Sequence, residues 1–549
     1  WTLVPRPLAE FHTDDVATIE QIASVAALLV FLAACMSAAN LCLARTASRR
    51  HELALHAALG VRRGRLARHL LTEALIVALS GGAAGAGLAR VGVGVLRDSV
   101  PAALSDFVPG WAHLGVDTSS LFFALVASIC AMLAFAILPV FRAMRVDISA
   151  VLSDGGRAST GVHGPRTRSV LVVLEVCIAL SLLTSAALLM RSVNFMLSGN
   201  PGVRRDHVLT MHVSLASSLS DSAARDVYRR LDVALHAIPG VRAAGITNTT
   251  PLSNSSNGTY VSIPGRRAAL DGEPLTAINQ RTTPDYFRAA GIPLLAGRGI
   301  TSADVDGAPR VVVVSKLLAT TMWPKSEAVG NTVVIDSVPW TVVGVAADVR
   351  HHGFDEPVRM SVYRSIQQAL SRTSDVAVWT SGDPAAMREV VRGVVAHIDP
   401  LAAVGDPLTM QEIEARHVSP FRMVAGLLAV LAIITIVIAA VGLYGLIAYG
   451  VAQRVREIGI RIALGARAGD ILAHIGGGAL RLVGVGVVAG VAGALGFTRL
   501  LGGLLYGVGP NDPRTLIGAA LFLGATALAA ALIPAWRATR VDPVLALRE

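Results

Sequence analysis

Two adjacent histidines and two nearby aspartates form the one cluster in the sequence whose residue types could hold a metal ion. The cluster is His351 and His352 with Asp348 and Asp355. Imidazole and carboxylate groups are common zinc ligands. However, neighbouring side chains on an extended segment point to opposite faces, and no third histidine is near. We therefore expect a solvated loop here and predict no metal site.

The patterns typical of nucleotide binding and of hydrolysis are also missing from the sequence. No Gly-x-x-x-x-Gly-Lys-Ser/Thr loop occurs, and the two lysines, Lys316 and Lys325, fall in other contexts. There is no Gly-x-Ser-x-Gly elbow and no defensible pair of catalytic carboxylates. We predict that these residues form no catalytic site and hold no cofactor.

One short stretch occurs twice in the chain. Residues 52–62 read Glu-Leu-Ala-Leu-His-Ala-Ala-Leu-Gly-Val-Arg, and residues 457–467 read Glu-Ile-Gly-Ile-Arg-Ile-Ala-Leu-Gly-Ala-Arg. The second copy lies 405 positions after the first, as Glu457 does after Glu52 and Arg467 after Arg62. A second pair of similar segments, at 139–147 and 534–542, closes each half. Two pairs of similar segments in the same order predict two copies of one structural unit.

The hydropathy of the chain indicates a membrane protein. Hydrophobic residues make up 53% of the sequence, charged residues 16%, and the mean hydropathy is +0.58. A helix needs about 20 apolar residues to cross a bilayer. Seven runs qualify, at residues 22–44, 70–96, 119–141, 169–191, 421–450, 475–501 and 516–536. The predicted fold class is an α-helical membrane protein with seven transmembrane helices in two repeated units and an α+β periplasmic domain.

The positions of the arginines orient these spans. The formal net charge of +10 comes from arginine, and the arginines gather between the first and second spans, between the third and fourth, after the fifth and after the last. Such loops normally face the cytoplasm. This placement argues for membrane lipid and against nucleic acid as the partner of the basic charge. We predict a multi-pass protein of the bacterial inner membrane with a periplasmic region at 192–420 and a cytoplasmic C-terminus.

The repeated stretch lies in two of these arginine-rich loops. Residues 45–69 contain the apolar Leu53, Leu55, Ala58 and Leu59 among arginines, which is consistent with a short amphipathic helix at the membrane surface. Gly60 would end that helix. The alternative is a basic anchor that touches only lipid head groups. The second copy keeps the glutamate, the Ala-Leu-Gly turn and the arginine while its neighbours change, and this favours a docking element.

Few charged residues lie inside the predicted spans. Glu73, Arg90, Glu175, Arg481 and Arg499 all fall within about two turns of a span end. An ion pathway normally needs ionisable groups deep in the membrane. For Glu175 we expect the side chain to reach the membrane interface. Cys35, Cys42, Cys130 and Cys177 also fall inside spans and predict no disulfide framework.

The outside region mixes strands and helices. Alternating or β-branched runs predict strands at 208–214, 241–247, 311–315 and 376–380 and a hairpin from 332–335 and 340–345. Helical spacing predicts helices at 222–238, which makes a β-α-β unit, and at 384–398. Residues 248–283 are polar and rich in turn formers, and we expect a mobile loop with edge strands there.

These motifs together resemble a known family. The arginine-rich linker with Glu-x-x-x-x-x-Ala-Leu-Gly-x-Arg and the terminal Pro-x-x-Arg-Ala-x-Arg-Val-Asp-Pro look like those of FtsX/MacB-type ABC transporter permeases. Residues 283–298, Thr-Pro-Asp-Tyr-Phe-Arg-Ala-Ala-Gly-Ile-Pro-Leu-Leu-Ala-Gly-Arg, are similar to the MacB-like periplasmic core domain. Two such units in one chain resemble the duplicated, acidobacterial-type permeases. In the first copy, Ile148 stands where the second has Pro543.

The resemblance implies a division of the chain. It predicts the end of a first periplasmic domain at 1–21, a first FtsX-like permease unit of three helices at 22–141 and a cytoplasmic linker at 142–168. It then predicts the first helix of the second unit at 169–191, a MacB-like periplasmic core domain at 192–420 and the second FtsX-like permease unit, with three helices, at 421–549. It also implies an N-terminally incomplete chain that lacks the first helix.

The resemblance further implies partners and a role. A separate cytoplasmic ABC ATPase, which binds ATP and magnesium, would dock on the two repeated segments. The expected coupling residues are Glu52, Leu59, Gly60, Arg62, Glu457, Leu464, Gly465 and Arg467. A periplasmic adaptor or a substrate protein is a further expected partner. The predicted function is the permease subunit of an ATP-driven export or mechanotransmission system.

Two other classes of function remain open on the residues alone. One is a signalling or scaffold protein whose periplasmic domain regulates another envelope protein, such as a cell-wall hydrolase. The other is an ion-coupled secondary transporter. Such transporters often contain inverted repeats, whereas both copies here place the repeated stretch on the same side, so this class is disfavoured.

Overall fold

The computed structural model describes residues 14–48, 63–99, 115–144, 164–253, 257–264, 269–270, 273–354, 356–452, 460–461, 464 and 468–538. The chain divides into two compact units. Trp1–Ser192 together with Phe421–Glu549 form one, the helical unit, and Val193–Pro420 form the other, the α+β unit. Each is described by itself.

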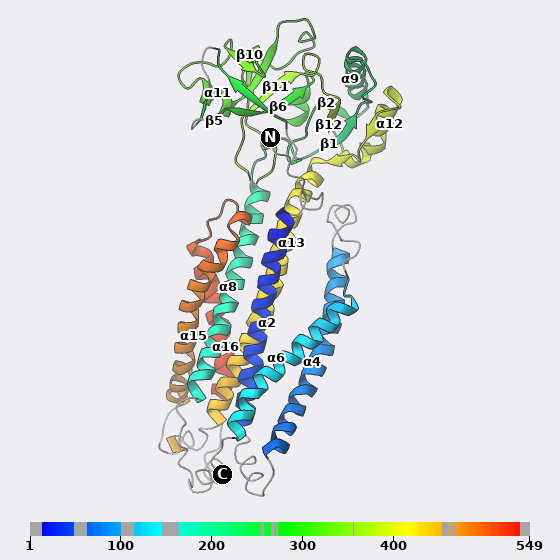
Figure 1. The fold of residues 1–549 in the computed structure, drawn as a ribbon. Helices are drawn as coiled ribbons and strands as arrows, with labels where there is room; N and C mark the ends of the chain where they lie inside the picture. The colour runs from blue at the N-terminus through cyan, green and yellow to red at the C-terminus, as the bar shows by residue number, and fades with distance from the viewer. Residues whose placement is uncertain are drawn as a thin grey trace. The chain divides into compact units, whose positions relative to one another are not determined.

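Long apolar helices make up the helical unit (Figure 1). They are α2 (Asp14–Ser48), α4 (Arg63–Ser99), α6 (Thr118–Met144), α8 (Gly164–Ser198), α13 (Met410–Ala452), α15 (Ala468–Leu500) and α16 (Pro513–Ala538). Six of them are long and apolar enough to cross a membrane, and they contain six of the seven predicted spans. The span predicted at 119–141 falls in α6, whose apolar stretch within the described residues is the shorter Thr118–Leu133.

Glycines allow two of these helices to approach closely. A β-carbon built on Gly486 of α15 would lie 2.8 Å from Val176 Cβ, and one on Gly490 would lie 2.9 Å from Leu180 Cδ2. Both partners are buried on α8. Small residues at such spacing are a common means of packing membrane helices. Gly486 and Gly490 therefore allow α15 to pack closely against α8. On α4, Gly82 is the glycine with a near neighbour in the described structure, Leu125 Cδ1 at 3.1 Å.

The α+β unit contains a sheet whose strands follow the order β11-β8-β10-β9-β3-β6-β2-β12-β1-β13. Because β11 also pairs with β6, the first six strands of this order close into a ring. They are β3 (Gly258–Ser262), β6 (Thr276–Thr282), β8 (Val311–Ser315), β9 (Thr332–Ile335), β10 (Val338–Ala346) and β11 (Ser361–Ser365). Apolar side chains of all six strands form one core, joined by Leu318 and Met322 of α11 (Lys316–Met322).

The remaining strands form an open sheet with two helices packed on it. The strands are β1 (Val208–Ser214), β2 (Val241–Thr247) and β12 (Thr373–Thr380), with β13 (Ala403–Val404) and β14 (Leu408–Thr409) paired to β1. The helices are α9 (Asp221–His236) and α12 (Arg388–Ile398), which lie side by side in Figure 1. Ser220 caps α9 by accepting from the Ala223 amide. This sheet and these helices share a second core.

Shorter elements complete the α+β unit. They are β4 (Ala269–Leu270), β5 (Glu273–Pro274), α10 (Tyr286–Ala290), β7 (Leu294–Gly297) and the 3-10 turn η2 (Pro384–Met387). The predicted hairpin is confirmed, since β9 and β10 pair antiparallel around Asp336 and Ser337. Both turn residues have positive φ angles, +50° and +67°, as a two-residue hairpin turn requires.

The sheet confirms one prediction about this unit and corrects another. The predicted β-α-β unit is present at 208–247, and β12 lies between β1 and β2 and pairs antiparallel with both. The interpretation of 248–283 as a mobile loop with edge strands is wrong for its last part. Residues 276–282 form β6, which is mostly buried and pairs with β3, β11 and β2. The polar sequence of β6 does not indicate a central strand. Its strand partners also come from distant parts of the chain, so local patterns do not reveal the pairing.

Candidate functional site

The two repeated segments lie between the ends of long helices. The first follows α2, which ends at Ser48, and precedes α4, which begins at Arg63. Glu52, Leu59, Gly60 and Arg62 lie outside the described residues. The second lies between Ala452 at the end of α13 and Ala468 at the start of α15. Each segment therefore joins two apolar helices of the helical unit.

One predicted coupling residue is described. The Leu464 amide donates to the Ile460 carbonyl oxygen at 3.0 Å, which is one helical turn. The Leu464 side chain is 82% exposed. Glu457, Gly465 and Arg467 lie outside the described residues. A leucine with an exposed side chain beside a helical turn is available for contact with a membrane surface or with another protein.

Arginine–tyrosine contacts hold the helices near the second segment. The Arg168 guanidinium of α8 lies over the Tyr449 ring of α13, 4.4 Å from its centroid. One turn further from the segment, Arg537 of α16 donates to the Tyr444 hydroxyl at 3.3 Å. A cation over an aromatic face is stabilising, more so when it is desolvated. These contacts connect three helices close to the point where α13 leads into the repeated segment.

In the α+β unit, the segment 283–298 builds a compact turn on β2. Tyr286 and Phe287 of α10 are buried, and the Phe287 ring packs edge-on against Tyr363 with centroids 5.1 Å apart. A β-carbon on Gly245 of β2 would lie 2.4 Å from Tyr286 Cα. Gly291 ends the helix with a φ of +70°. This segment is therefore a packing element of the α+β unit.

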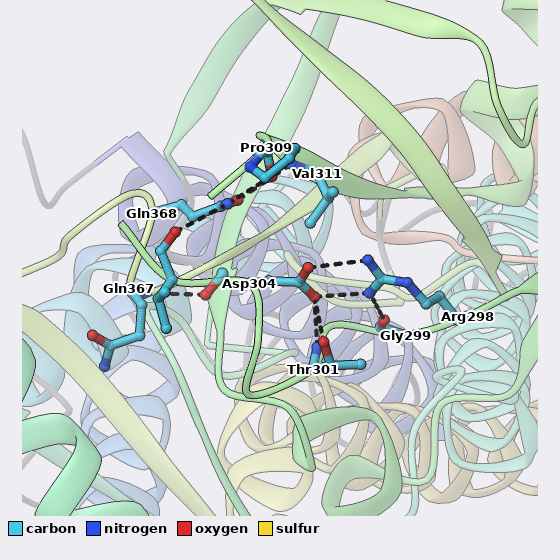
Figure 2. Close-up of polar contacts among 10 residues, drawn as sticks. Arg298, Gly299, Thr301, Asp304, Pro309, Val311, Gln367 and Gln368 are labelled. Carbon is cyan, nitrogen blue, oxygen red and sulfur yellow. Dashed lines mark hydrogen bonds and ion pairs between the residues drawn. The ribbon is translucent and has the colours of Figure 1, made fainter. Parts of the chain in front are cut away.

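The last residue of this segment, Arg298, fixes the loop that follows it (Figure 2). Arg298 Nη1 and Nη2 donate to the two carboxylate oxygens of Asp304 at 2.8 and 3.0 Å. The amide and hydroxyl of Thr301 donate to Asp304 Oδ2 at 2.7 and 2.9 Å. Burial alone would raise the pKa of Asp304, but the hydrogen bonds from Arg298 and Thr301 outweigh it and hold that pKa below its usual range.

Gln368 closes the other end of the loop. Its side-chain oxygen accepts from the Val311 amide at 3.2 Å, and its amide nitrogen donates to the Pro309 carbonyl oxygen at 2.9 Å (Figure 2). The loop from Arg298 to Val311 is thus held at both ends by side chains. Such a rigid loop can present a constant surface to a partner.

Among the described residues, no group of three or more histidine, cysteine or acidic side chains could hold a metal ion. The expectation of a solvated loop is wrong for His351. It is buried and its Nδ1 lies 3.2 Å from Gln280 Nε2. Burial, and then the charge of His352, lowers the pKa of His351 to about 3. Asp348 accepts from the Leu317 amide at 2.8 Å, and Asp355 lies outside the described residues.

Two buried acids differ from the sequence-based picture. Glu414 at the start of α13 forms an ion pair with Arg205, which sequence analysis missed, because the residues lie far apart in the chain and neither belongs to a motif. Glu175 on α8 does not reach an interface: its side chain is fully buried among helices. A single acidic residue in an apolar run can indicate a buried carboxyl group, but the sequence does not identify the residues that surround it.

Six of the described helices are long and apolar enough to cross a membrane, so the fold is that of a multi-pass membrane protein with a separate α+β domain. Two family models match the chain. The MacB-like periplasmic core domain matches residues 169–396, and the FtsX-like permease C-terminal domain matches two segments, 24–148 and 429–543. The chain therefore belongs to the FtsX/MacB-type ABC permeases, as the sequence motifs predict.

Individual relatives agree with this assignment. The chain is 29% identical over 282 residues to the macrolide export ATP-binding/permease protein MacB 1/2 of Paracoccus denitrificans, which covers 48% of this chain and 41% of that protein. It is 25% identical over 289 residues to the uncharacterized ABC transporter permease YvrN of Bacillus subtilis, covering 48% of this chain and 68% of that protein. The chain thus spans less than half the length of the MacB relative.

A solved structure is also similar. The periplasmic region of MacB from Actinobacillus actinomycetemcomitans aligns with 38% of this chain and 93% of that chain, at 16% sequence identity and a TM-score of 0.27.

Proposed function

We propose that the chain is the permease subunit of an ABC-type export or mechanotransmission system driven by a separate cytoplasmic ATPase. The observation that carries this proposal is the pair of FtsX-like permease segments on either side of one MacB-like periplasmic domain. The 549 residues contain no phosphate-binding loop. ATP and magnesium would therefore be bound by the partner ATPase.

The repeated segments are the proposed docking points of that ATPase. Each joins two long apolar helices, and a force on the segment would act on both helix ends. In the second segment, the exposed Leu464 supports a contact surface. The eight coupling residues named from the sequence, headed by Glu52 and Glu457, remain the proposed contacts. The charges of the two glutamates and of Arg62 and Arg467 would set the orientation of docking.

The proposed topology has seven transmembrane helices in two repeated units, with the C-terminus in the cytoplasm. Arginine placement supports this orientation. The family model that matches twice begins at residues 24 and 429, again 405 positions apart. In this arrangement α2 and α13 are equivalent helices of the two units. Ser37 of α2 donates to the Ile438 carbonyl oxygen of α13 at 3.4 Å, so equivalent helices contact each other.

Motion would reach the periplasmic domain through α8 and α13, which continue from the helical unit into the α+β unit. Inside the α+β unit, Arg205 Nη1 donates to the Leu197 carbonyl oxygen of α8 at 3.0 Å, and Nη2 lies 2.9 Å from Glu414 Oε1 of α13. One arginine therefore connects the end of one helix to the start of the other. A shift of either helix would be transmitted to the domain core.

Copurification from detergent tests the proposal. The full-length protein is compared with Glu52→Arg and Glu457→Arg, and with Glu389→Arg, an exposed glutamate of the α+β unit, as control. We expect an ABC ATPase to copurify and either repeat substitution to reduce it, while the control does not. If no ATPase copurifies with the unaltered protein, the proposal that a separate ATPase drives this permease is wrong. Recovery of a cell-wall hydrolase with the periplasmic domain would then favour the alternative function, a signalling or scaffold protein that regulates another envelope protein.

A further inference from the structure

The carboxyl group of Glu175 has no partner in the described structure. The side chain is fully buried on α8, and neither Oε1 nor Oε2 has a hydrogen-bond partner among the described residues. Removing a charged group from water without a partner is very unfavourable, and ionisable residues inside membrane helices mark functional sites by default. The group therefore needs an occupant that the protein itself does not supply.

Three helices meet at this carboxyl group. A β-carbon built on Gly442 of α13 would lie 2.5 Å from Glu175 Oε2 and 3.1 Å from Ser37 Oγ of α2. The Glu175 carboxyl group thus lies directly against the backbone of α13, and Ser37 approaches the same glycine. Glycine is the residue type that leaves room for this approach, since any side chain would occupy the position of the carboxyl oxygen.

The polar groups around Gly442 have an excess of acceptors. Asn40 Nδ2 donates to the Gly442 carbonyl oxygen at 3.3 Å, and Ser37 Oγ donates to the Ile438 carbonyl oxygen. Both side-chain donors therefore form their hydrogen bonds with carbonyl oxygens of α13. Asn40 Oδ1 has no partner in the described structure, like the two oxygens of Glu175. Three buried acceptors without a donor require a proton or a cation.

The charged and titratable side chains on the helices packed there lie at other levels or have other contacts. Arg168, two turns before Glu175 on α8, lies over Tyr449. Arg537 of α16 donates to Tyr444. Cys35 of α2 and Arg481 of α15 are further titratable groups of the helical unit, and Cys177 of α8 donates to the Ala489 carbonyl oxygen at 3.5 Å. Neither carboxyl oxygen of Glu175 accepts a hydrogen bond from any of these groups among the described residues.

We propose that Glu175 is a proton-binding site between α2 and α13, occupied when these helices pack as they do here. A bound proton removes the charge and supplies a donor among the three acceptors. The site is asymmetric, because Ser37 stands 405 positions before Gly442 and so has a side chain where α13 has none. The role does not depend on how the ATPase docks. It links protonation of one carboxyl group to the contact between two helices.

Infrared spectroscopy tests this site directly. The full-length protein in lipid nanodiscs, in heavy water near neutral pH, is compared with Glu175→Gln. A protonated carboxylic acid absorbs at a C=O frequency well separated from that of a carboxylate. We expect the difference spectrum to show the loss of one protonated-acid band. Glu389→Gln, which removes an exposed glutamate, should remove only carboxylate bands.

Two results would overturn the proposal. One is the loss of only carboxylate bands in Glu175→Gln. The other is a carboxylate signal of Glu175 that changes with sodium concentration at fixed pH, which would make the occupant a metal cation.

Gly442→Ala provides a second variant if the glutamine variant does not fold. Its new methyl group would displace the carboxyl group, so we expect the protonated-acid band to shift or disappear. Gly450→Ala on the same helix has no atom within 4 Å of its new carbon in the described structure and should leave the band unchanged. An unchanged band in Gly442→Ala would place the signal elsewhere and contradict the assignment.

Discussion

Arg205 Nη2 lies 2.9 Å from Glu414 Oε1 and so joins the end of α8 to the start of α13 within the α+β unit. The Glu414 side chain is nearly buried, and the Arg205 guanidinium also lies 5.8 Å from the centre of the Phe354 ring. These two helices lead into the helical unit through residues 192 and 421. Within the α+β unit, the pair therefore connects the two helices through which the proposed motion would reach the periplasmic domain.

Arg205→Ala should loosen this junction. The substitution leaves the Glu414 carboxylate without its counter-ion. Leaving a buried polar group unsatisfied costs about 1–3 kcal/mol, and a charged group costs more. Hydrogen–deuterium exchange should become faster in residues 193–198 and 410–414. Arg229→Ala is the control, because Arg229 pairs with Asp226 on the exposed face of α9 and exposed pairs contribute little. Equal exchange in both variants would show that the Arg205 pair does not hold the junction.

Asp304→Asn should release the loop between Arg298 and Val311. The amide keeps the shape of the side chain but loses the charge-assisted bonds to Arg298. We expect the free energy of unfolding to fall by about 1–2 kcal/mol, a modest amount because Arg298 is half exposed. Because the pKa of Asp304 is lowered in the fold, its contribution is complete above about pH 4, the unfolded value, and is lost as pH falls through the folded pKa. Amide exchange of residues 299–310 at pH 7 measures the release.

Asp306→Asn is the matched control for that loop. Asp306 is 65% exposed and pairs with Arg225 at 3.2 Å. Its substitution should change the exchange of residues 299–310 much less than Asp304→Asn does. If the two variants behave alike, the loop is held by its backbone and the role of Arg298 is overstated.

His351 should make the α+β unit sensitive to mild acid. The pKa of His351 is lowered to about 3 by burial, whereas an unfolded histidine titrates at about 6.5. The folded state therefore binds fewer protons, and the contribution of His351 is complete above pH 6.5 and falls as pH drops toward 3, by about 1.4 kcal/mol per pH unit. His351→Gln should reduce this slope, measured as the thermal unfolding of the α+β unit between pH 7.5 and 5.

His397→Gln, at an exposed site on α12, controls for the loss of a histidine as such. The comparison concerns the slope with pH, because His351→Gln can also lower stability at every pH by disturbing Gln280. A slope unchanged from the unaltered protein would contradict the burial of a neutral His351.

Local patterns in the sequence are sufficient to predict several elements of this fold. The strands at 208–214, 241–247 and 311–315 have the predicted bounds, because alternation or β-branched runs are properties of a few adjacent residues. The apolar spans are equally local. The closure of six strands into a ring is not, because it depends on the pairing of β6 with β11, more than 80 positions apart, as Ile278 pairs with Ser361.

The candidate sites also divide into those that local sequence patterns predict and those that depend on contacts between distant residues. The repeated segments are visible in the sequence because the chain contains them twice, although most of their residues lie outside the described structure. The burial of Glu175 and of His351 could not be predicted, because each depends on neighbours from other helices or strands. Gly442 and Gln280 belong to no motif, and only the fold brings them to these side chains.

The contact between Gly245 and α10 allows a last prediction. The β-carbon of Gly245→Ala would lie 2.4 Å from Tyr286 Cα and 2.7 Å from its nitrogen, so the new methyl group would meet backbone atoms that cannot rotate away. Forcing extra volume into a packed core typically costs about 1–3 kcal/mol. We expect a lower unfolding temperature of the α+β unit and faster exchange of residues 283–292. Gly382→Ala, where no atom lies within 4 Å in the described structure, should change neither. If Gly245→Ala is as stable as this control, the segment 283–298 does not pack on β2 as described, and its role as a structural element has to be abandoned.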